Sequence, residues 1–360
     1  MEYLIDRFGD GHVLLMAGAI VGAIFGMSAQ HARFCLRAAS VEVSEGRFGA
    51  RLAIWLIAFG GAVFCVQGLI AMGMLDVSQS RQLASTGSIS GAIIGGLMFG
   101  AGMILARGCA SRLLVLSATG NLRAIVTGLV LTLVAQASLR GVLAPTRESL
   151  SGLWTVSGGD ARNLLTQVGA SHGMAAVAAL AVLVAGGVLA HRSSVDLSRI
   201  MAAMAVGGAV GLGWVLTYAV SQASFDVVAV SSVTFTGPST DTLMGLVNAT
   251  ELPLSFGVGL VPGVFVGAAF MALVTGEARI ERFGADTPME RYLIGAALMG
   301  FGSMLAGGCA VGAGVSGGAI FALTAWVAVF CMWIGAMVTH LLMQSAIRHA
   351  PSRSGGMPQP

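Results

Sequence analysis

The chain has 360 residues, of which 56% are hydrophobic and only 10% are charged, and its mean hydropathy is +0.86. A soluble domain is typically about 25% charged, so this chain has too little polar surface to cover a water-soluble globule. Its 52 glycines are typical of membrane helices, where small residues let backbones approach closely. The net charge is only +3, and the basic residues of the chain are scattered singly rather than clustered on one face as in a nucleic-acid-binding protein. We therefore expect an all-α polytopic membrane protein.

Apolar runs follow one another along the chain at lengths that suit membrane helices. A bilayer core about 30 Å thick needs roughly 20 apolar residues per helix. Nine spans are predicted, at 12–29, 52–75, 91–106, 123–140, 174–190, 200–220, 253–274, 292–306 and 318–342. The third and the eighth are short, and each runs into a glycine-rich turn that contains a cysteine. Because no Asp, Glu, Lys or Arg occurs from Tyr292 to Ile347, the turn around Cys309 is expected to lie at membrane depth, where it must be buried in protein or line a wet cavity.

The 19 basic residues are all arginines, and their placement orients the spans. Fourteen fall on one side of a nine-span arrangement and five on the other. The five are Arg7, Arg81, Arg140, Arg147 and Arg162. The positive-inside rule then places the N-terminus outside and the C-terminus in the cytoplasm. The longest polar connection, 141–173, falls outside, and residues 346–360 are predicted to form a disordered cytoplasmic tail.

A cysteine-containing segment recurs along the chain. Residues 95–110 and 295–310 agree at eight of sixteen positions, including a shared Gly-Cys-Ala. Residues 22–35 and 96–109 agree at six of fourteen, including the cysteine and the arginine two residues before it. Glycine and alanine are frequent in this chain, but their frequency does not explain why a rare cysteine closes all three copies.

A weaker fourth copy would end in Ser224. In the span arrangement, the first two cysteine turns open from the cytoplasmic side, whereas the Ser224 turn and the third cysteine turn open from outside. The segments 12–140 and 200–342 are therefore predicted to be two halves of opposite orientation, joined by a linker helix at 174–190, within a single membrane transport domain, 1–345. Such inverted repeats are typical of transporters, whose substrate site lies at the repeat interface near the midplane.

The recurring cysteines Cys35, Cys109 and Cys309 are the candidate substrate-binding residues. Each occupies a glycine-flanked turn that is expected to enter a half-helix, where unpaired N–H groups and the helix dipole favour an anion. Thiols are weak donors and soft, polarisable groups, so they suit an anion with a sulfur or selenium end better than sulfate. Cys65 and Cys331 lie inside ordinary apolar spans and are expected to be packing residues.

Glycines and arginines beside these cysteines complete the predicted site. Gly108 and Gly308 directly precede the second and third cysteines. Arg107 and Arg112, like the two arginines beside Cys35, either attract an anion at the inner mouth or serve only as topology determinants. The sequence contains no phosphate loop, metal-type histidine pair or nucleophile elbow, so neither an enzymatic activity nor a metal or cofactor is predicted.

Three segments, Ala-Arg-Phe-Cys35, Ala-Arg-Gly-Cys109-Ala-Ser-Arg and Ala-Gly-Gly-Cys309-Ala-Val-Gly-Ala-Gly, resemble the cysteine motifs of the YeeE/YedE sulphur-transport family. The resemblance covers most of residues 12–345. It implies a bacterial inner-membrane protein with an inverted-repeat helical bundle of nine spanning helices and several short half-helices. It also implies uptake of thiosulfate, handed along a narrow path by the three cysteines, and a small TusA-like sulfur-carrier protein as partner. The connection 141–173 is long for the family.

Other functions remain open on the sequence alone. Some relatives are linked to selenium, so another sulfur or selenium species is an alternative substrate. A Cu(I) carrier is disfavoured because the cysteines are not accompanied by methionines at ligand spacing. A membrane sulfurtransferase would need an activated thiolate in an electropositive pocket, and Cys109, with Arg107 and Arg112 nearby, is the candidate for carrying a persulfide.

Overall fold

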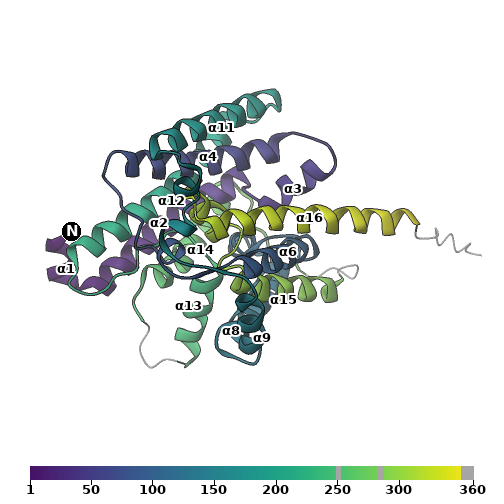
Figure 1. The fold of residues 1–360 in the computed structure, drawn as a ribbon. Helices are drawn as coiled ribbons and strands as arrows, with labels where there is room; N and C mark the ends of the chain where they lie inside the picture. The colour runs from purple at the N-terminus through teal and green to yellow at the C-terminus, as the bar shows by residue number, and fades with distance from the viewer. Residues whose placement is uncertain (249–252, 283–287, 350–360) are drawn as a thin grey trace, which may run out of the picture.

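The computed structural model describes residues 1–248, 253–282 and 288–349, and helices make up most of them (Figure 1). Up to residue 140 the elements are α1 (Glu2–Phe8), α2 (Asp10–Ala32), α3 (Leu36–Ser44), α4 (Ala50–Ala71), α5 (Arg81–Ala84), β1 (Gly87–Ser88), α6 (Ile89–Leu105), α7 (Ala110–Ala118) and α8 (Leu122–Arg140). Then follow α9 (Ala144–Gly152), β2 (Thr155–Val156), η1 (Gly159–Arg162), α10 (Leu164–Val168), α11 (His172–Arg192), α12 (Leu197–Ala223), α13 (Thr236–Asn248), α14 (Phe256–Val274), α15 (Met289–Leu305), η2 (Gly312–Gly317) and α16 (Leu323–His349).

Eight helical segments of the described residues are long and apolar enough to cross a membrane, so the chain is an all-α, multi-pass membrane protein. They are Asp10–Ser44, Ala50–Ala71, Ile89–Ala118, Leu122–Arg140, His172–Arg192, Leu197–Ala223, Phe256–Val274 and Leu323–Ala346. The predicted span 292–306 coincides with α15, which has 17 residues. At 1.5 Å per residue such a helix reaches about 25 Å, less than the hydrocarbon core.

Helix α15 nevertheless packs lengthwise against α6 and also against α8. A Cβ built on Gly95 of α6 would lie 2.4 Å from the Gly302 carbonyl oxygen, and one on Gly102 would lie 2.6 Å from the Gly295 oxygen, so α6 and α15 run antiparallel in close contact. Helix α16 packs along α6 in the parallel direction. The chain therefore reverses its direction through α15, as a ninth pass requires.

Glycines interlock the other central helices. Helices α2 and α14 run parallel, and Cβ atoms on Gly22 and on Gly263 would lie 2.4 Å from the carbonyl oxygens of Leu260 and Ala19. Lipid tails are as apolar as these side chains, so close backbone packing of this kind is what holds membrane helices together. Helix α11 lies along α4 at one edge of the bundle, and α8 and α9 lie at the opposite edge (Figure 1).

In the main helix pairs, a helix from the first half of the chain packs on a helix from the second half. Helix α2 packs on α14, while α12 packs on α4; α6 packs on α16, while α15 packs on α8. Helices α2 and α12 also touch each other, as do α6 and α15. A two-fold axis in the membrane plane that relates α2 to α12 and α6 to α15 would generate this pattern.

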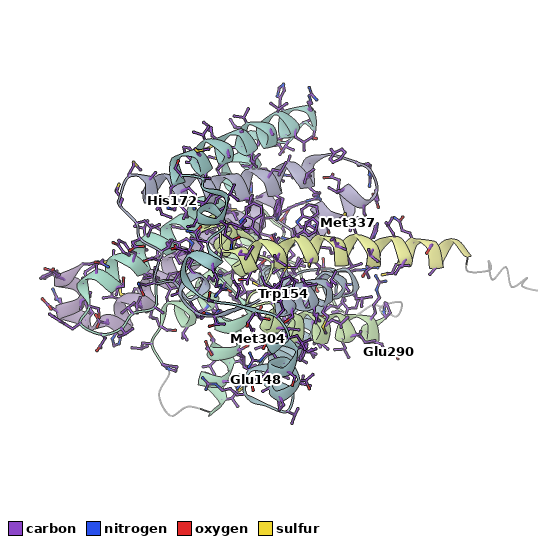
Figure 2. All side chains as sticks on the ribbon, in the orientation of Figure 1. Glu148, Trp154, His172, Glu290, Met304 and Met337 are labelled. Carbon is purple, nitrogen blue, oxygen red and sulfur yellow. The ribbon has the colours of Figure 1, made fainter. Side chains whose placement is uncertain are left out.

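The connection 141–173 is folded rather than extended. It contains α9, β2, η1 and α10, and β2 pairs antiparallel with β1, placing Gly87 opposite Val156. The Trp154 carbonyl oxygen accepts the Ile89 amide at 2.8 Å, which ties the connection to the start of α6. Figure 2 shows Glu148, Trp154 and Met304 along the same part of the bundle. The connection therefore covers the end of the bundle at which α6 begins and α15 ends.

The last predicted elements differ from the structure at their ends. The π-helix η2 separates Cys309 from α16, so α16 begins at Leu323 rather than near residue 318. Helix α16 continues through His349, so residues 346–349 of the predicted tail are helical, and α16 projects beyond the other helices at this end (Figure 1). The rest of the tail, 350–360, lies outside the described residues.

Candidate transport path

The three cysteine turns share one backbone geometry. After each of the helices α2, α6 and α15, the residue two positions before the cysteine has a positive φ: Arg33 (54°), Arg107 (55°) and Gly307 (78°). In each turn the next amide donates to the carbonyl oxygen five residues earlier, a Schellman closure. These bonds are Phe34 N to Ala29 O at 3.0 Å, Gly108 N to Met103 O at 3.1 Å and Gly308 N to Ser303 O at 2.9 Å.

Each cysteine then accepts the first hydrogen bond of the helix that follows. The Cys35 and Cys109 carbonyl oxygens accept from amides of α3 and α7, and the Cys309 carbonyl oxygen accepts from Ala313. Cys35 and Cys109 therefore stand at the N-termini of α3 and α7, where the dipole contributes partial positive charge, whereas Cys309 lies three residues before the short π-helix η2. The Ser224 turn is different: α12 continues through Ala223, Gln222 two residues before Ser224 has no positive φ, and the Ser224 hydroxyl donates to the Asp10 carboxylate at 2.8 Å.

The structure brings Cys35 and Cys109 together. Their side chains are neighbours, and the charge of Arg112, three residues after Cys109 in α7, acts on both. Cys109 is buried, with its sulfur 3.3 Å from the Ser111 hydroxyl oxygen. Thus the second repeat supplies a thiol and a cation to the turn of the first.

Cys309 follows the opposite end of the helix pair. Because α6 and α15 are antiparallel, the turn after α15 and the turn after α6 lie at opposed ends. The Cys309 sulfur is buried and accepts the Gly312 amide at 3.4 Å. A Cβ on Gly308 would lie 2.9 Å from the Ala313 amide nitrogen, so glycine allows the turn to fold tightly on itself. The three cysteines therefore do not converge in one cluster; two are together and one is separate.

A cavity of about 540 Å³ opens beside Cys35, and we call it the Cys35 cavity. It is lined by six arginines: Arg33, Arg37, Arg51, Arg107, Arg112 and Arg279. Two carboxylates, Glu277 and Glu281, also line it, so basic side chains outnumber acidic ones. Two arginines predicted from the sequence, Arg107 and Arg112, thus lie in one cavity with Cys35, whereas Cys109 is buried and does not line it.

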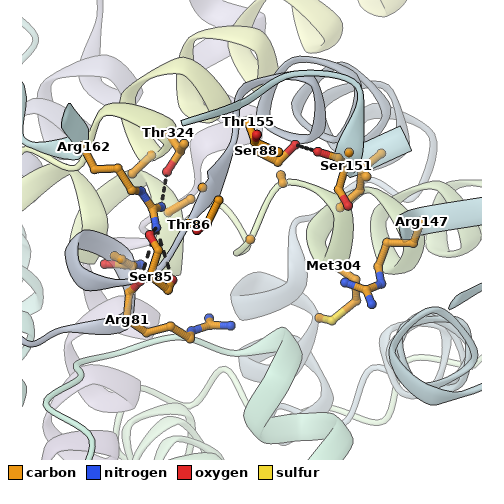
Figure 3. Close-up of a pocket in the computed structure, with 18 residues that line it drawn as sticks. Arg81, Ser85, Thr86, Ser88, Arg147, Ser151, Thr155, Arg162, Met304 and Thr324 are labelled. Carbon is orange, nitrogen blue, oxygen red and sulfur yellow. Dashed lines mark hydrogen bonds between the residues drawn. The ribbon is translucent and has the colours of Figure 1, made fainter. Parts of the chain in front are cut away.

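A second cavity of about 350 Å³ lies at the other end of α6, and we call it the Arg162 cavity (Figure 3). Residues on both sides of the Cys309 turn, Gly307 and Ala313, form part of its wall. Its polar lining consists of Arg81, Gln82, Ser85, Thr86, Ser88, Arg147, Ser151, Thr155, Arg162 and Thr324. Among the described residues no Asp or Glu lines it, so the cavity is suited to an anion.

Arg162 is the most constrained cation of this cavity. Its side chain is 6% exposed and donates to the Ser85 carbonyl oxygen and the Thr324 hydroxyl, each at 2.6 Å (Figure 3). Neither of these partners is a carboxylate. Burial, and then the nearby charge of Arg81, lower the pKa of the Arg162 guanidinium. The usual pKa of arginine is so high that the group stays charged at neutral pH. Among the described residues no carboxylate forms a salt bridge with this buried guanidinium.

The sequence did not single out the Arg162 cavity. Arg81, Arg147 and Arg162 counted only as arginines outside the membrane, and two of them lie in the connection 141–173. Their position in an unusually long polar connection was the available signal, but only the β1–β2 pairing brings this connection to the start of α6.

Cys65 and Cys331 lie in helix–helix contacts. A Cβ on Gly211 of α12 would lie 2.5 Å from the Cys65 sulfur, and one on Gly96 of α6 would lie 2.8 Å from the Cys331 Cβ. Both cysteines therefore fill space against a neighbouring helix.

Comparison with known proteins places these features in a family. The family model described as sulphur transport matches residues 31–338. A thiosulfate transporter, TsuA, of Escherichia coli (strain K12) is 25% identical over 346 residues, which cover 89% of this chain and 92% of the relative. A TsuA of Spirochaeta thermophila is 25% identical over 328 residues, covering 88% of this chain and 94% of the relative.

Proposed function

Because the chain belongs to the sulphur-transport family, we propose that it carries thiosulfate inward across the bacterial inner membrane. The observation that carries the proposal is the presence of two arginine-rich cavities at opposite ends of the α6–α15 pair, each beside a cysteine turn. Two relatives that match nearly the whole chain are named thiosulfate transporters. An anion would meet positive charge at both ends and soft sulfur donors at both turns.

The proposed route begins at the Arg162 cavity, passes Cys309, and reaches the Cys35 cavity through Cys109 and Cys35. Thiosulfate has oxygen atoms that suit arginine and a terminal sulfur that suits a thiol. Backbone amides at the helix N-termini add to the attraction. The proposed two halves, 12–140 and 200–342, would present these turns to opposite faces, and the helix pairs formed between the halves support this arrangement.

On the cytoplasmic side, the proposed acceptor is a small TusA-like sulfur-carrier protein, as the family resemblance implies. The alternative function is a membrane sulfurtransferase, favoured by the pair of neighbouring thiols beside Arg112. Mass spectrometry of the protein after exposure to thiosulfate separates the two functions. A stable added sulfur atom on Cys109 would support the enzyme, and an unmodified Cys109 during active uptake would support transport alone.

Growth on thiosulfate tests the proposed function directly. Cells lacking their own thiosulfate and sulfate uptake should grow on thiosulfate as sole sulfur source when they express this chain. Their uptake of labelled thiosulfate should be reduced little by excess sulfate or copper. Competition by selenite would reveal a broader substrate range. If the expressing cells do not take up thiosulfate above the empty-vector level, the proposed function is wrong.

A further inference from the structure

Glu277 places a carboxylate among the arginines of the Cys35 cavity. It follows α14 and accepts hydrogen bonds from Arg33 Nη2 and Gln30 Nε2, both at 2.7 Å. The Glu277 side chain is 35% exposed, whereas Gln30 is only 4% exposed. The carboxylate thus occupies a place where a mobile anion would find the same donors.

Gln30 connects this carboxylate to the cation beside the cysteines. Its amide nitrogen donates to Glu277, and its amide oxygen accepts from Arg112 Nη1 at 3.3 Å. Arg112 lines the same cavity as Cys35 and lies three residues after Cys109 in α7. The buried amide of Gln30 therefore links Glu277 to Arg112 through one hydrogen bond on each side.

The backbone holds Glu277 in place. Its amide donates to the Ala272 carbonyl oxygen at 2.8 Å, which closes the end of α14. Two residues later, Arg279 donates to the Thr119 carbonyl oxygen at 3.0 Å, and Glu281 donates to Gly120 at 3.1 Å. The segment is thus fastened to the loop between α7 and α8, and these backbone bonds hold Glu277 at the wall of the cavity.

A divalent anion in a cavity with six arginines would bind tightly and leave slowly. Passage through a membrane protein requires binding that is strong enough for entering and weak enough for leaving. A fixed carboxylate lowers the affinity of the cavity by competing for the same guanidinium groups. The hydrogen bond from Arg33 is the main factor that keeps the pKa of Glu277 below its usual range, so this competitor is charged at neutral pH.

We propose that Glu277 is a built-in competing anion that promotes release of the transported anion from the Cys35 cavity. The inference rests on the proposed thiosulfate transport. As thiosulfate leaves Cys35 and Cys109, it binds Arg112 and Arg33. The Glu277 carboxylate then forms its hydrogen bonds with Arg33 and Gln30 again, which displaces the anion. Glu277 does not touch the cysteines; it acts through the cations that the anion must leave.

Neutralising Glu277 tests the inference. Uptake of labelled thiosulfate is measured in membrane vesicles of known orientation, with unlabelled thiosulfate added on the side of the Cys35 cavity. In Glu277→Gln, this added thiosulfate should inhibit at an about three- to tenfold lower concentration than in the wild type, because one negative charge near a divalent anion is gone. The maximal rate should fall several-fold, while KM for thiosulfate on the other side changes little.

Two further variants separate competition from loss of structure. Glu277→Asp keeps the charge, so added thiosulfate should inhibit this variant at the same concentration as the wild type. Arg33→Gln removes a cation, so inhibition should need more thiosulfate, the opposite shift. Glu45→Gln is the matched control, since Glu45 also binds an arginine, Arg47, but does not line the cavity. It should behave like the wild type.

The outcomes distinguish this inference from the proposed function. If the wild type transports thiosulfate and Glu277→Gln shows unchanged or weaker inhibition, the inference is wrong while the proposed function stands. The inference is also contradicted if added thiosulfate inhibits Arg33→Gln at the same concentration as the wild type. This second test remains available if Glu277→Gln cannot be purified in folded form. If the wild type itself carries no thiosulfate, both the proposed function and the inference fail.

Discussion

Arginine side chains line both cavities, but among the described residues carboxylates line only the Cys35 cavity. In the Cys35 cavity Glu277 and Glu281 offset part of the positive charge. In the Arg162 cavity the described lining contains no acidic side chain, and buried Arg162 has only neutral oxygen partners. This difference is suited to an anion that is captured at one end and released at the other.

Arg81 provides a test of capture at the level of one residue. It is exposed at the Arg162 cavity, so Arg81→Gln should leave the fold intact. We expect KM for thiosulfate to rise about three- to tenfold through the lost attraction for a divalent anion, with little change in maximal rate. Arg7→Gln, an exposed arginine outside the cavity, is the control. An unchanged KM at low salt would contradict a role for this cavity in capture.

The elements themselves were largely predictable, whereas their ends and several short helices were not. Hydropathy located α2, α4 and α11 within a few residues because each is a long apolar run. Helix α13 was missed because its sequence, rich in Thr, Ser and Gly, contains no such run; it is packed against α14 and α8. The π-helix η2 lies close against Thr234 and Ala325, and this packing between distant residues is not visible in the sequence.

Glycine packing between α2 and α14 gives a prediction for an element. Gly263→Leu places side-chain atoms where the Ala19 carbonyl oxygen lies, so the helices must separate. Overpacking typically destabilises by about 1–3 kcal/mol, and backbone contact makes the upper end or more expected here. Gly208→Leu is the control, because nothing lies within 4 Å of a Cβ there. Thermal unfolding of the detergent-purified protein should show a lower midpoint for Gly263→Leu; equal midpoints would contradict the packing.

The depth of the Cys309 turn is a second property of an element. Cys309 is 1% exposed, so a maleimide reagent that cannot cross membranes should label it far more slowly than an engineered Ser157→Cys in the exposed connection. Intact cells expressing variants with one of these cysteines would show the difference. Labelling of Cys309 at the rate of the loop cysteine would mean that the turn is superficial.

At the scale of the whole molecule, the sequence predicted the class of protein and the cysteine turns better than the cavities. Each repeated turn is formed by a few consecutive residues, so a local sequence pattern can indicate it, as the shared positive φ at Arg33 and Arg107 illustrates. The cavities are built from distant segments: Glu277 meets Gln30, and Arg162 meets Thr324. No local pattern indicates such pairs, so Glu277 and Arg162 could be recognised only once the helices were placed.

Topology can be tested on the whole chain. The arginines counted on the cytoplasmic side include all six that line the Cys35 cavity, and those counted outside include the three of the Arg162 cavity. The positive-inside rule then predicts an external N-terminus and a cytoplasmic C-terminus. Reporter fusions at the C-terminus should be active only for a reporter that works in the cytoplasm. Activity of a periplasm-specific reporter there would reverse the orientation.

The central claim is that thiosulfate passes by way of the repeated cysteines, and uptake by purified protein in liposomes tests it most directly. Cys109→Ala and Cys309→Ala should abolish uptake of labelled thiosulfate, and Cys35→Ala should weaken or abolish it. Losing one donor to a desolvated anion costs about 1.5–3 kcal/mol, or roughly 10–150-fold in occupancy. Serine should rescue poorly, because its hydroxyl is harder than a thiol.

Cys65→Ala and Cys331→Ala provide matched controls, because these cysteines only fill space between helices. They should transport at nearly the wild-type rate, with protein amount and elution profile similar for all five variants. The predicted result is loss of uptake confined to the repeated cysteines. Wild-type rates in all five alanine variants would show that the repeated cysteines are packing residues and would contradict the proposed path.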